Sequence, residues 1–248
     1  MRAESVWTNQ AVLTELALAA LAFCSGTMDV ASFLTLGNVF TSAMTGNTAL
    51  LGIALSQGHL VSAAHTLSAL IGFIIGAALA AVIGLRLAPS PTLPRMPERV
   101  RKGGNRDLIR ALLTTEILCL VTVGVMLTII GAPADGAAVF WLIVISAVGM
   151  GIQGVTARHI HSPGINTIVF TSTLISIVIS LAELLMRHSS TAALSSDAKR
   201  QIGIFLAYGF GAVLAGLLIG LVLPIVAWIP AVAALIALGC CEAAGRNS

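Results

Sequence analysis

Charged residues are scarce in this sequence. Only 9% of its 248 residues are Asp, Glu, Lys or Arg, whereas 57% are hydrophobic. A soluble domain carries roughly 25% charged residues, because its surface must stay hydrated. So few charges exclude a water-exposed surface over most of the chain. The formal net charge of +3 comes from local clusters, so the broad basic face typical of nucleic-acid binding is also excluded.

Patterns that would indicate catalysis or metal binding are missing as well. The four cysteines lie in apolar stretches without a C-x-x-C spacing, which argues against a disulfide framework and a zinc site. The sequence has no H-E-x-x-H, no G-x-S-x-G and no Walker A loop. We therefore predict no catalytic residues, no metal ligands and no cofactor, and we expect that the protein is not an enzyme.

Long apolar stretches take up most of the chain. About 20 apolar residues in a helix span the hydrocarbon core of a bilayer, because each residue rises about 1.5 Å and every backbone polar group must be paired. Seven such stretches are residues 12–36, 61–85, 108–130, 138–157, 168–186, 202–221 and 225–241, and a shorter, polar-interrupted one is 39–55. The sequence predicts an all-α, polytopic transmembrane helix bundle with seven to eight membrane segments, and six as the lower limit.

Two motifs recur along the chain. The triplet Phe40-Thr41-Ser42 returns as Phe170-Thr171-Ser172. Small residues four positions apart also occur twice, at Gly76, Ala80 and Gly84 and at Ala212, Gly216 and Gly220. The repeats indicate two related halves, 1–88 with 108–131 as its last helix, and 132–248. An even number of crossings in each half predicts the same orientation for both, with an axis along the membrane normal. The small residues favour close helix packing, within the chain or in a homo-oligomer.

Residues 89–107 form the longest polar segment. Four prolines and the pair Gly103-Gly104 predict an irregular linker between the halves. Its arginines and Lys102 predict a cytoplasmic location. Eight crossings then leave both termini outside, with a thin margin in the count of basic residues. If residues 39–55 do not cross, the N-terminus lies inside.

Acidic residues inside apolar stretches are candidates for function, because a charge at the bilayer centre costs about 2.5 to 3.5 kcal/mol on insertion scales. Asp29 and Glu116 are the leading cases. Such a carboxyl group must pair, take up a proton or line a wet cavity. The structural alternatives are an interfacial position for Asp29 and a hydrogen bond to a neighbouring helix for Glu116.

A second candidate is the run Thr45, Gly46, Asn47 and Thr48, which stands between apolar stretches. Gly46 permits an unusual backbone, and the polar side chains can replace lost backbone hydrogen bonds, so the run predicts a helix break that exposes polar groups to a solute or ion. The alternative is a polar seam between packed helices. The corresponding stretch from Thr171 has hydroxyl groups but no Gly-Asn pair.

The residues from Asp29 to Leu34, with Gly37, Val39-Phe40, the run 44–47 and Leu51-Gly52, resemble the signature of the YoaK-like family of bacterial membrane proteins. A second signature is similar to the run 149–153, which ends at Gln153, together with Ala157-Arg158 and the Thr171 region. The family often has Thr-Gly-Thr where this chain has Thr171-Ser172-Thr173, and Gln-Asn where it has Gln153-Gly154. The resemblance implies a multi-pass protein of the bacterial inner membrane, and a small-molecule transporter.

Two functions remain open on the sequence. The first is a secondary transporter or permease for a small solute, coupled to protons or cations or driven by the solute gradient. Asp29 and Glu116 would then handle the proton or cation, and 45–48, Gln153 and Thr171 would line the path. The second is a membrane scaffold or partner subunit in which the same groups fix helix packing. A water-filled cavity at Asp29 favours transport, whereas a dry, fully paired Asp29 favours the scaffold.

Overall fold

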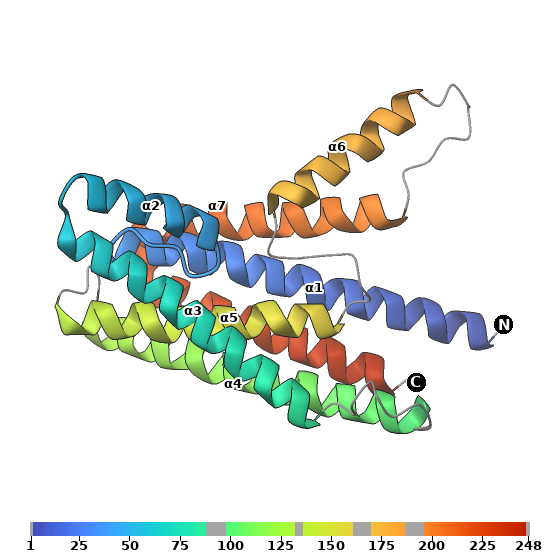
Figure 1. Ribbon diagram of the computed structural model, residues 1–248. Coiled ribbons are helices and arrows are strands. Elements are labelled where there is room, and N and C mark those ends of the chain that lie inside the picture. Colours follow the sequence, from blue (N-terminus) through green and yellow to red (C-terminus); the bar gives the residue numbers. More distant parts are fainter. Residues whose placement is uncertain (1, 88–97, 132–135, 161–169, 187–195, 247–248) are drawn as a thin grey trace.

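The computed structural model describes residues 2–87, 98–131, 136–160, 170–186 and 196–246, and these residues form a bundle of seven helices (Figure 1). The helices are α1 (Arg2–Thr35), α2 (Met44–Ser56), α3 (Leu60–Leu87), α4 (Glu98–Ile130), α5 (Ala137–Ile160), α6 (Phe170–Met186) and α7 (Ser196–Arg246). Five of them, α1, α3, α4, α5 and α7, are long and apolar enough to cross a bilayer. The predicted all-α membrane bundle is confirmed.

Helix α7 consists of two arms. Its backbone leaves the helical conformation at Val222 (φ −145°, ψ 59°), two residues before Pro224. Proline lacks the amide hydrogen and clashes with the preceding turn, so a helix bends there. The bend falls between the predicted segments 202–221 and 225–241, which are thus two crossings. Together with the other four long helices, the two arms of α7 give the described chain six segments that are long and apolar enough to cross.

Helix α2 does not cross the membrane. Its 13 residues extend about 20 Å, short of the roughly 30 Å hydrocarbon core. After α1 ends, residues 36–43 turn back along the bundle, so that Ser42 lies level with Asp29, about 9 Å inside the end of α1. Figure 1 shows α2 running from there to the end of the bundle where α1 stops. Residues 36–56 therefore form a re-entrant loop and half-helix.

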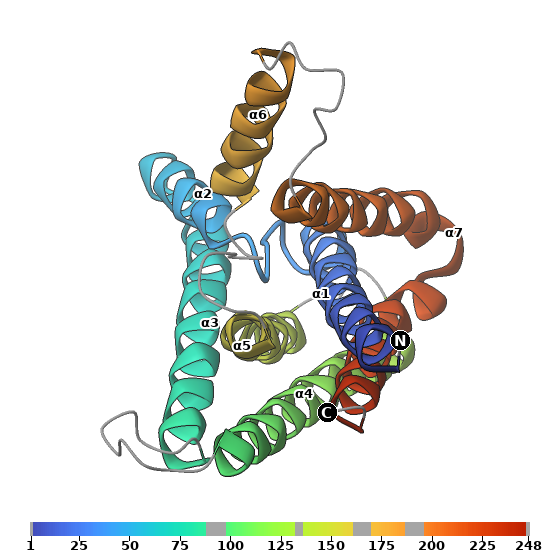
Figure 2. The same cartoon turned by 90° about the vertical axis from the view of Figure 1, so that its right-hand side faces the viewer.

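Helix α6 occupies the corresponding place in the second half. The chain leaves α5 and enters α7 at the same end of the bundle, so residues between them return to that end (Figure 1). Helix α6 begins beside the first arm of α7 and runs toward this end, opposite to α2. The end-on view in Figure 2 shows α5 inside the bundle, whereas α6 projects outward. The two half-helices thus start near mid-depth and point in opposite directions.

Two glycine-mediated crossings hold the long helices together. A Cβ atom on Gly26 of α1 would overlap the carbonyl of Tyr208 on α7, and one on Gly211 would overlap the carbonyl of Phe23. Contacts of the same kind join α3 and α5, where Gly76 meets Val148 and Gly151 meets Phe73. Close approach of two backbones requires small residues at the contact. Each crossing joins the first long helix of one half to a helix of the other.

The two crossings have the same register, which shows how the halves correspond. Phe73, Gly76 and Ala77 have the spacing of Tyr208, Gly211 and Ala212. Helix α3 therefore matches the first arm of α7, and α1 matches α5. The repeat of small residues in the sequence pairs Gly76 with Ala212, whereas in the structure Gly76 corresponds to Gly211, one residue earlier. Gly76 and Gly211 thus lie in contacts between helices of the same chain. A homo-oligomer formed through small residues stays a prediction.

The halves are inverted with respect to each other, so the predicted axis along the membrane normal is wrong. Helices α1 and the first arm of α7 run in parallel, as do α3 and α5, but the two pairs point in opposite directions (Figure 1). The prediction failed because it counted residues 39–55 as a crossing. Three crossings in each half reverse the second half and place the axis in the membrane plane.

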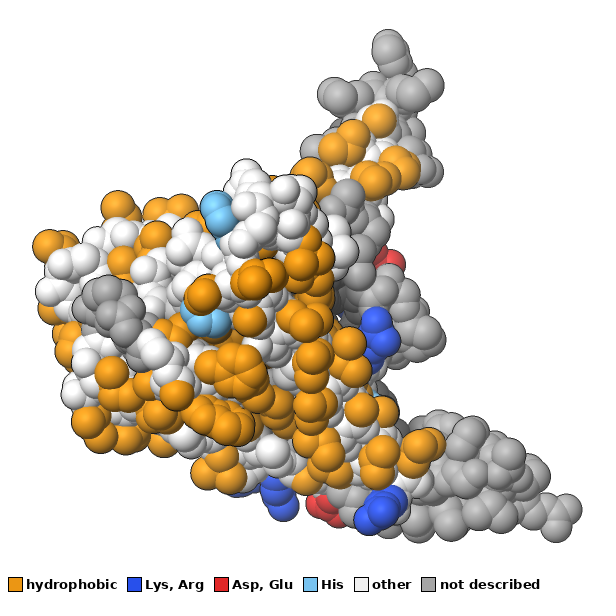
Figure 3. All heavy atoms as spheres, turned by 60° about the vertical axis from the view of Figure 1, so that its left-hand side comes forward, with side chains coloured by type: hydrophobic (Ala, Val, Ile, Leu, Met, Phe, Trp, Pro, Cys, Tyr) orange, Lys and Arg blue, Asp and Glu red, His pale blue; other side chains and the backbone are white. Residues whose placement is uncertain are grey.

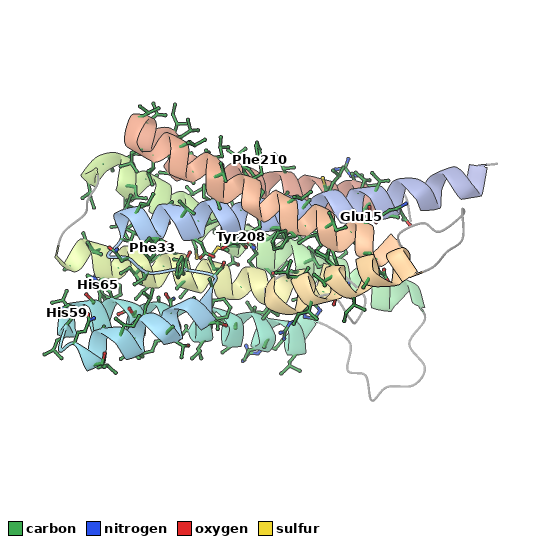
Figure 4. All side chains as sticks on the ribbon, turned by 90° about the horizontal axis from the view of Figure 1, so that it is seen from above. Glu15, Phe33, His59, His65, Tyr208 and Phe210 are labelled. Carbon is green, nitrogen blue, oxygen red and sulfur yellow. The ribbon has the colours of Figure 1, made fainter. Side chains whose placement is uncertain are left out.

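The described Lys and Arg side chains all lie at one end of the bundle, the basic end. They are Arg86, Arg106, Arg110, Arg158, Lys199, Arg200 and Arg246. Figure 3 shows basic side chains at the edges of a largely apolar surface, and Figure 4 places His59 and His65 at the end opposite to Glu15. The positive-inside rule makes the basic end cytoplasmic. Both termini lie at this end, which fits the six-crossing alternative and an N-terminus that lies inside, as expected if residues 39–55 do not cross.

The expected linker 89–107 is partly helical. Residues 88–97 lie outside the described part, but α4 already begins at Glu98 and includes the Gly103-Gly104 pair. Each glycine costs a helix about 1 kcal/mol relative to alanine. That cost is small beside the stability of a helix that continues into the membrane. At its start, Arg106 and Arg110 bind Glu242 of α7 at 2.9 and 2.6 Å.

Candidate functional site

Asp29 holds the re-entrant loop in place. Its side chain is buried, and Oδ1 accepts the backbone N–H groups of Thr41 at 2.9 Å and Ser42 at 2.7 Å. Oδ2 accepts the hydroxyl groups of Ser42 at 2.5 Å and of Tyr208 at 2.9 Å. Three residues thus donate four hydrogen bonds, an arrangement that suits an ionised carboxylate. Asp29 is therefore dry and fully paired, and neither an interfacial position nor a wet cavity describes it.

The position of Asp29 also suits the start of α2. The first N–H groups of a helix carry partial positive charge and lack partners within the helix. Asp29 accepts the amides of Thr41 and Ser42, immediately before Ala43 and α2. The carboxylate thus binds the two backbone amides that precede the N-cap residue Ala43, which places a negative charge near the N-terminus of α2. Figure 4 shows Tyr208 projecting from α7 toward this loop.

Asn47 fastens the loop to α2 from the other side. Its Oδ1 accepts the backbone N–H of Phe40 at 2.9 Å, and its Nδ2 donates to the carbonyl of Phe40 at 2.6 Å. The side-chain amide thus pairs with a backbone amide as a neighbouring strand would. The ring of Phe40 stacks on Phe33 with centroids 4.9 Å apart. Non-helical backbone at membrane depth is tolerated because protein groups satisfy its hydrogen bonds.

The other residues of the run 45–48 have different positions from those expected. Thr45 and Thr48 are exposed on the outer face of α2, and the Thr48 hydroxyl donates to the carbonyl of Met44. Gly46 lies inside the helix, where a Cβ atom would come within 3.0 Å of the Phe40 ring. The backbone break comes earlier, with positive φ at Gly37 (76°) and Asn38 (60°). Gly46 permits close packing and does not break the helix.

Gln153 links α5 to α1 one turn below Asp29. Its amide nitrogen, Nε2, donates to Ser25 Oγ at 2.7 Å and to the carbonyl of Leu21 at 3.0 Å. Ser25 precedes Asp29 by one helical turn on the same face of α1. The other amide atom, Oε1, is buried and has no hydrogen-bond partner among the described residues.

Glu116 lies in the core of the bundle with no exposed surface. Neither carboxyl oxygen has a hydrogen-bond partner in the described part of the chain. The expected structural alternative, a hydrogen bond to a neighbouring helix, is therefore not seen there. Helix α5 passes at Gly149, whose Cβ position would be 3.9 Å from the carbonyl of Glu116. Gln153 follows Gly149 by one turn, so both unpartnered groups belong to the α4–α5 contact.

Comparison with known proteins agrees with this architecture. The model of the protein family of unknown function DUF1275 matches residues 17–240. The chain belongs to this family. A similar relative is the UPF0700 transmembrane protein YoaK of Bacillus subtilis (strain 168), which is 29% identical over 216 residues, covering 87% of this chain and 88% of the relative. No solved structure matches. The family membership and the apolar helices identify a multi-pass membrane protein.

Within this DUF1275 protein, sequence reasoning missed two donors to Asp29. Tyr208 is the only tyrosine of the chain and stands in an apolar helix, which is a usable signal. Ser42 was seen only as part of a repeated triplet. Thr171 of the second triplet lies in the first turn of α6, but its side chain is outside the described residues.

A hollow of about 540 Å³ opens at the end opposite to the basic end. Its walls include Thr35, Asn38 and His65, which are next to the start of the re-entrant loop, and the apolar Phe140. Asp29 and Asn47 are not among its lining residues. The loop 36–43 thus separates this hollow from the paired carboxylate.

Proposed function

We propose that this protein is a secondary transporter or permease for a small solute. The supporting observation is the pair of half-helices α2 and α6, which begin near mid-depth between two inverted three-crossing halves (Figure 1). Transporters with inverted repeats bind solutes where discontinuous helices meet, because helix ends and unwound backbone provide polar groups there. Movement would be driven by the solute gradient or by a coupled proton or cation.

The two half-helices differ in how they are held. Asp29 fixes the start of α2. In the correspondence between the halves, Gly26 matches Gly151, and Asp29 therefore matches Gly154. Gly154 has no side chain that could accept the equivalent hydrogen bonds. Among the described helices, α6 packs substantially only on α7. It projects outward from the bundle (Figure 2). In the proposal α2 is the fixed half of the barrier and α6 is the half that moves.

Accessibility of the loop tests the proposal without a known solute. Thr41→Cys is placed in a chain whose four native cysteines are replaced by serine or alanine, and thiosulfonate reagents are applied from either side of oriented membrane vesicles. Thr41 is fully buried in this conformation, so a transporter exposes it only when the barrier opens. We expect slow modification that becomes faster with Asp29→Asn. A cysteine at exposed Thr48 is the control for reagent delivery.

Direct flux is measured in proteoliposomes. Light scattering follows swelling in glycerol, urea and the ammonium salts of small carboxylic acids, compared with protein-free liposomes. If one of these solutes enters the proteoliposomes, and if Asp29→Asn, which destabilises the loop before α2, abolishes that entry, the result supports a permease. A protein whose Thr41→Cys is never modified and whose liposomes admit none of the probes is a scaffold.

The scaffold or partner subunit is the second candidate, and one observation favours it. Asp29 has four donors and no solvent, as a residue that only fixes helix packing would. In a scaffold, Asp29→Asn affects folding and leaves no flux to lose. The accessibility experiment distinguishes the two, because a scaffold needs no conformation in which Thr41 meets water.

A further inference from the structure

Glu116 is the least satisfied group in the described part of the protein. It has no exposed surface, and both carboxyl oxygens lack partners. None of the described ion pairs includes it. An ionised carboxylate without partners in an apolar interior is far more costly than a neutral acid, which forfeits only a hydrogen bond, about 1 to 3 kcal/mol.

A second unpartnered oxygen lies on α5, the helix that packs against α4 at Glu116. Gln153 on α5 has its amide nitrogen committed to α1, so its Oε1 is fixed within the core and remains unpartnered. Side chains of a helix lean toward its N-terminus, and α4 runs antiparallel to α5, so Glu116 leans toward the level of Gln153. A carboxylic O–H needs an acceptor such as this amide oxygen, whereas a carboxylate would be repelled by it.

The titratable groups on the packed helices do not provide a cation. Helix α1 contributes the thiol of Cys24 and, further along, the paired Asp29, and α4 itself contributes Cys119. The titratable residues of α7 that pack on the core are Tyr208, Cys240 and Cys241, and α5 contributes the non-titrating Gln153. The set has no lysine, arginine or histidine to stabilise a negative charge on Glu116.

We infer that Glu116 is a proton-binding site, occupied in this conformation, and that it rather than Asp29 carries the coupling proton. This rests on the proposed function as far as coupling is concerned. Release of the proton leaves a carboxylate that must reach water or a cation, so the α4–α5 contact must open. Asp29 is already balanced by four donors and gains nothing from a proton. The bound ion is thus H⁺, and the acid and the amide oxygen form its site.

Carbodiimide labelling tests the proton site independently of transport. Dicyclohexylcarbodiimide adds to protonated carboxyl groups in apolar surroundings, and mass spectrometry locates the product. With the full chain in membrane vesicles at neutral pH, we expect label on Glu116, complete loss of that label in Glu116→Gln, and unchanged label in Asp29→Asn. Infrared difference spectra should show a protonated-carboxyl band that is absent from Glu116→Gln. Because glutamine matches the shape of a protonated glutamic acid, this variant should remain folded.

Three outcomes would overturn the inference. The first is a folded wild-type protein without label or infrared band at neutral pH, which shows an ionised Glu116. The second is protection of Glu116 by Na⁺ at constant pH, which shows a cation site. The third is a band that Asp29→Asn removes and Glu116→Gln retains. Failure of these tests leaves the transport proposal standing, and failure of the flux experiments leaves the proton site standing.

Discussion

Tyr208 Oη and Asp29 Oδ2 lie 2.9 Å apart, although 179 residues separate them in the sequence. The hydrogen bond joins α7 of the second half to α1 of the first. At this level Gly26 lets the two backbones approach, and the same contact positions the carboxylate that holds the re-entrant loop. The inverted halves and the loop are therefore stabilised at one place.

Tyr208→Phe should destabilise the protein by about 1 to 2 kcal/mol, because Asp29 loses one interhelical donor while the ring still packs. Asp29→Asn should cost more, since the amide nitrogen would face groups that donate. Thermal unfolding in detergent measures both changes. Equal stability of wild type and Tyr208→Phe would mean that the hydroxyl does not serve the clamp.

Gly211→Ala should destabilise the chain by about 1 to 3 kcal/mol, because the new methyl group overlaps the carbonyl of Phe23. Gly209 lies on the same helix with open space around its Cβ position. Gly209→Ala should be neutral or stabilising by up to about 1 kcal/mol, since alanine favours helix. Comparing the two variants separates the effect of helix propensity from that of the backbone contact. Equal changes in stability for both variants would contradict the close α1–α7 contact at Gly211.

Asn47→Asp should loosen residues 36–43. Aspartate can still accept the N–H of Phe40 but can no longer donate to its carbonyl. Hydrogen exchange of the Phe40 amide, followed by mass spectrometry, should become faster. Thr48→Ala, on the exposed face of the same helix, is the matched control and should leave this exchange unchanged.

Topology reporters should assign both termini to the cytoplasm. Phosphatase fusions are expected to be active after Gly58 and Gly136, at the end opposite to the basic end, and inactive after Arg246. Fluorescent-protein fusions should give the reverse pattern. Activity on opposite sides for the two termini would mean that α2 or α6 crosses, and that the halves are not inverted.

The sequence was sufficient to predict the long helices and the separation of segment 202–221 from segment 225–241, because both depend on local composition. It also pointed to Asp29 and Glu116 as acidic residues inside apolar stretches, and both are buried. It could not predict that residues 39–55 re-enter, since a half-helix and a weak crossing have the same polar content. The predicted symmetry axis along the membrane normal was wrong because residues 39–55 had been counted as a crossing. The partners of Asp29 were also beyond reach, because Tyr208 approaches it only through the α1–α7 crossing.

The concentration of cations at one end of two inverted halves has a consequence for biosynthesis. Matching segments must insert in opposite directions, so their flanking charges must be reversed. Arg86 lies in the last turn of α3, whereas Lys199 and Arg200 lie near the start of the arm of α7 that matches it. The arginines and lysines therefore assign each half its own direction of insertion, so that one polypeptide contains both orientations.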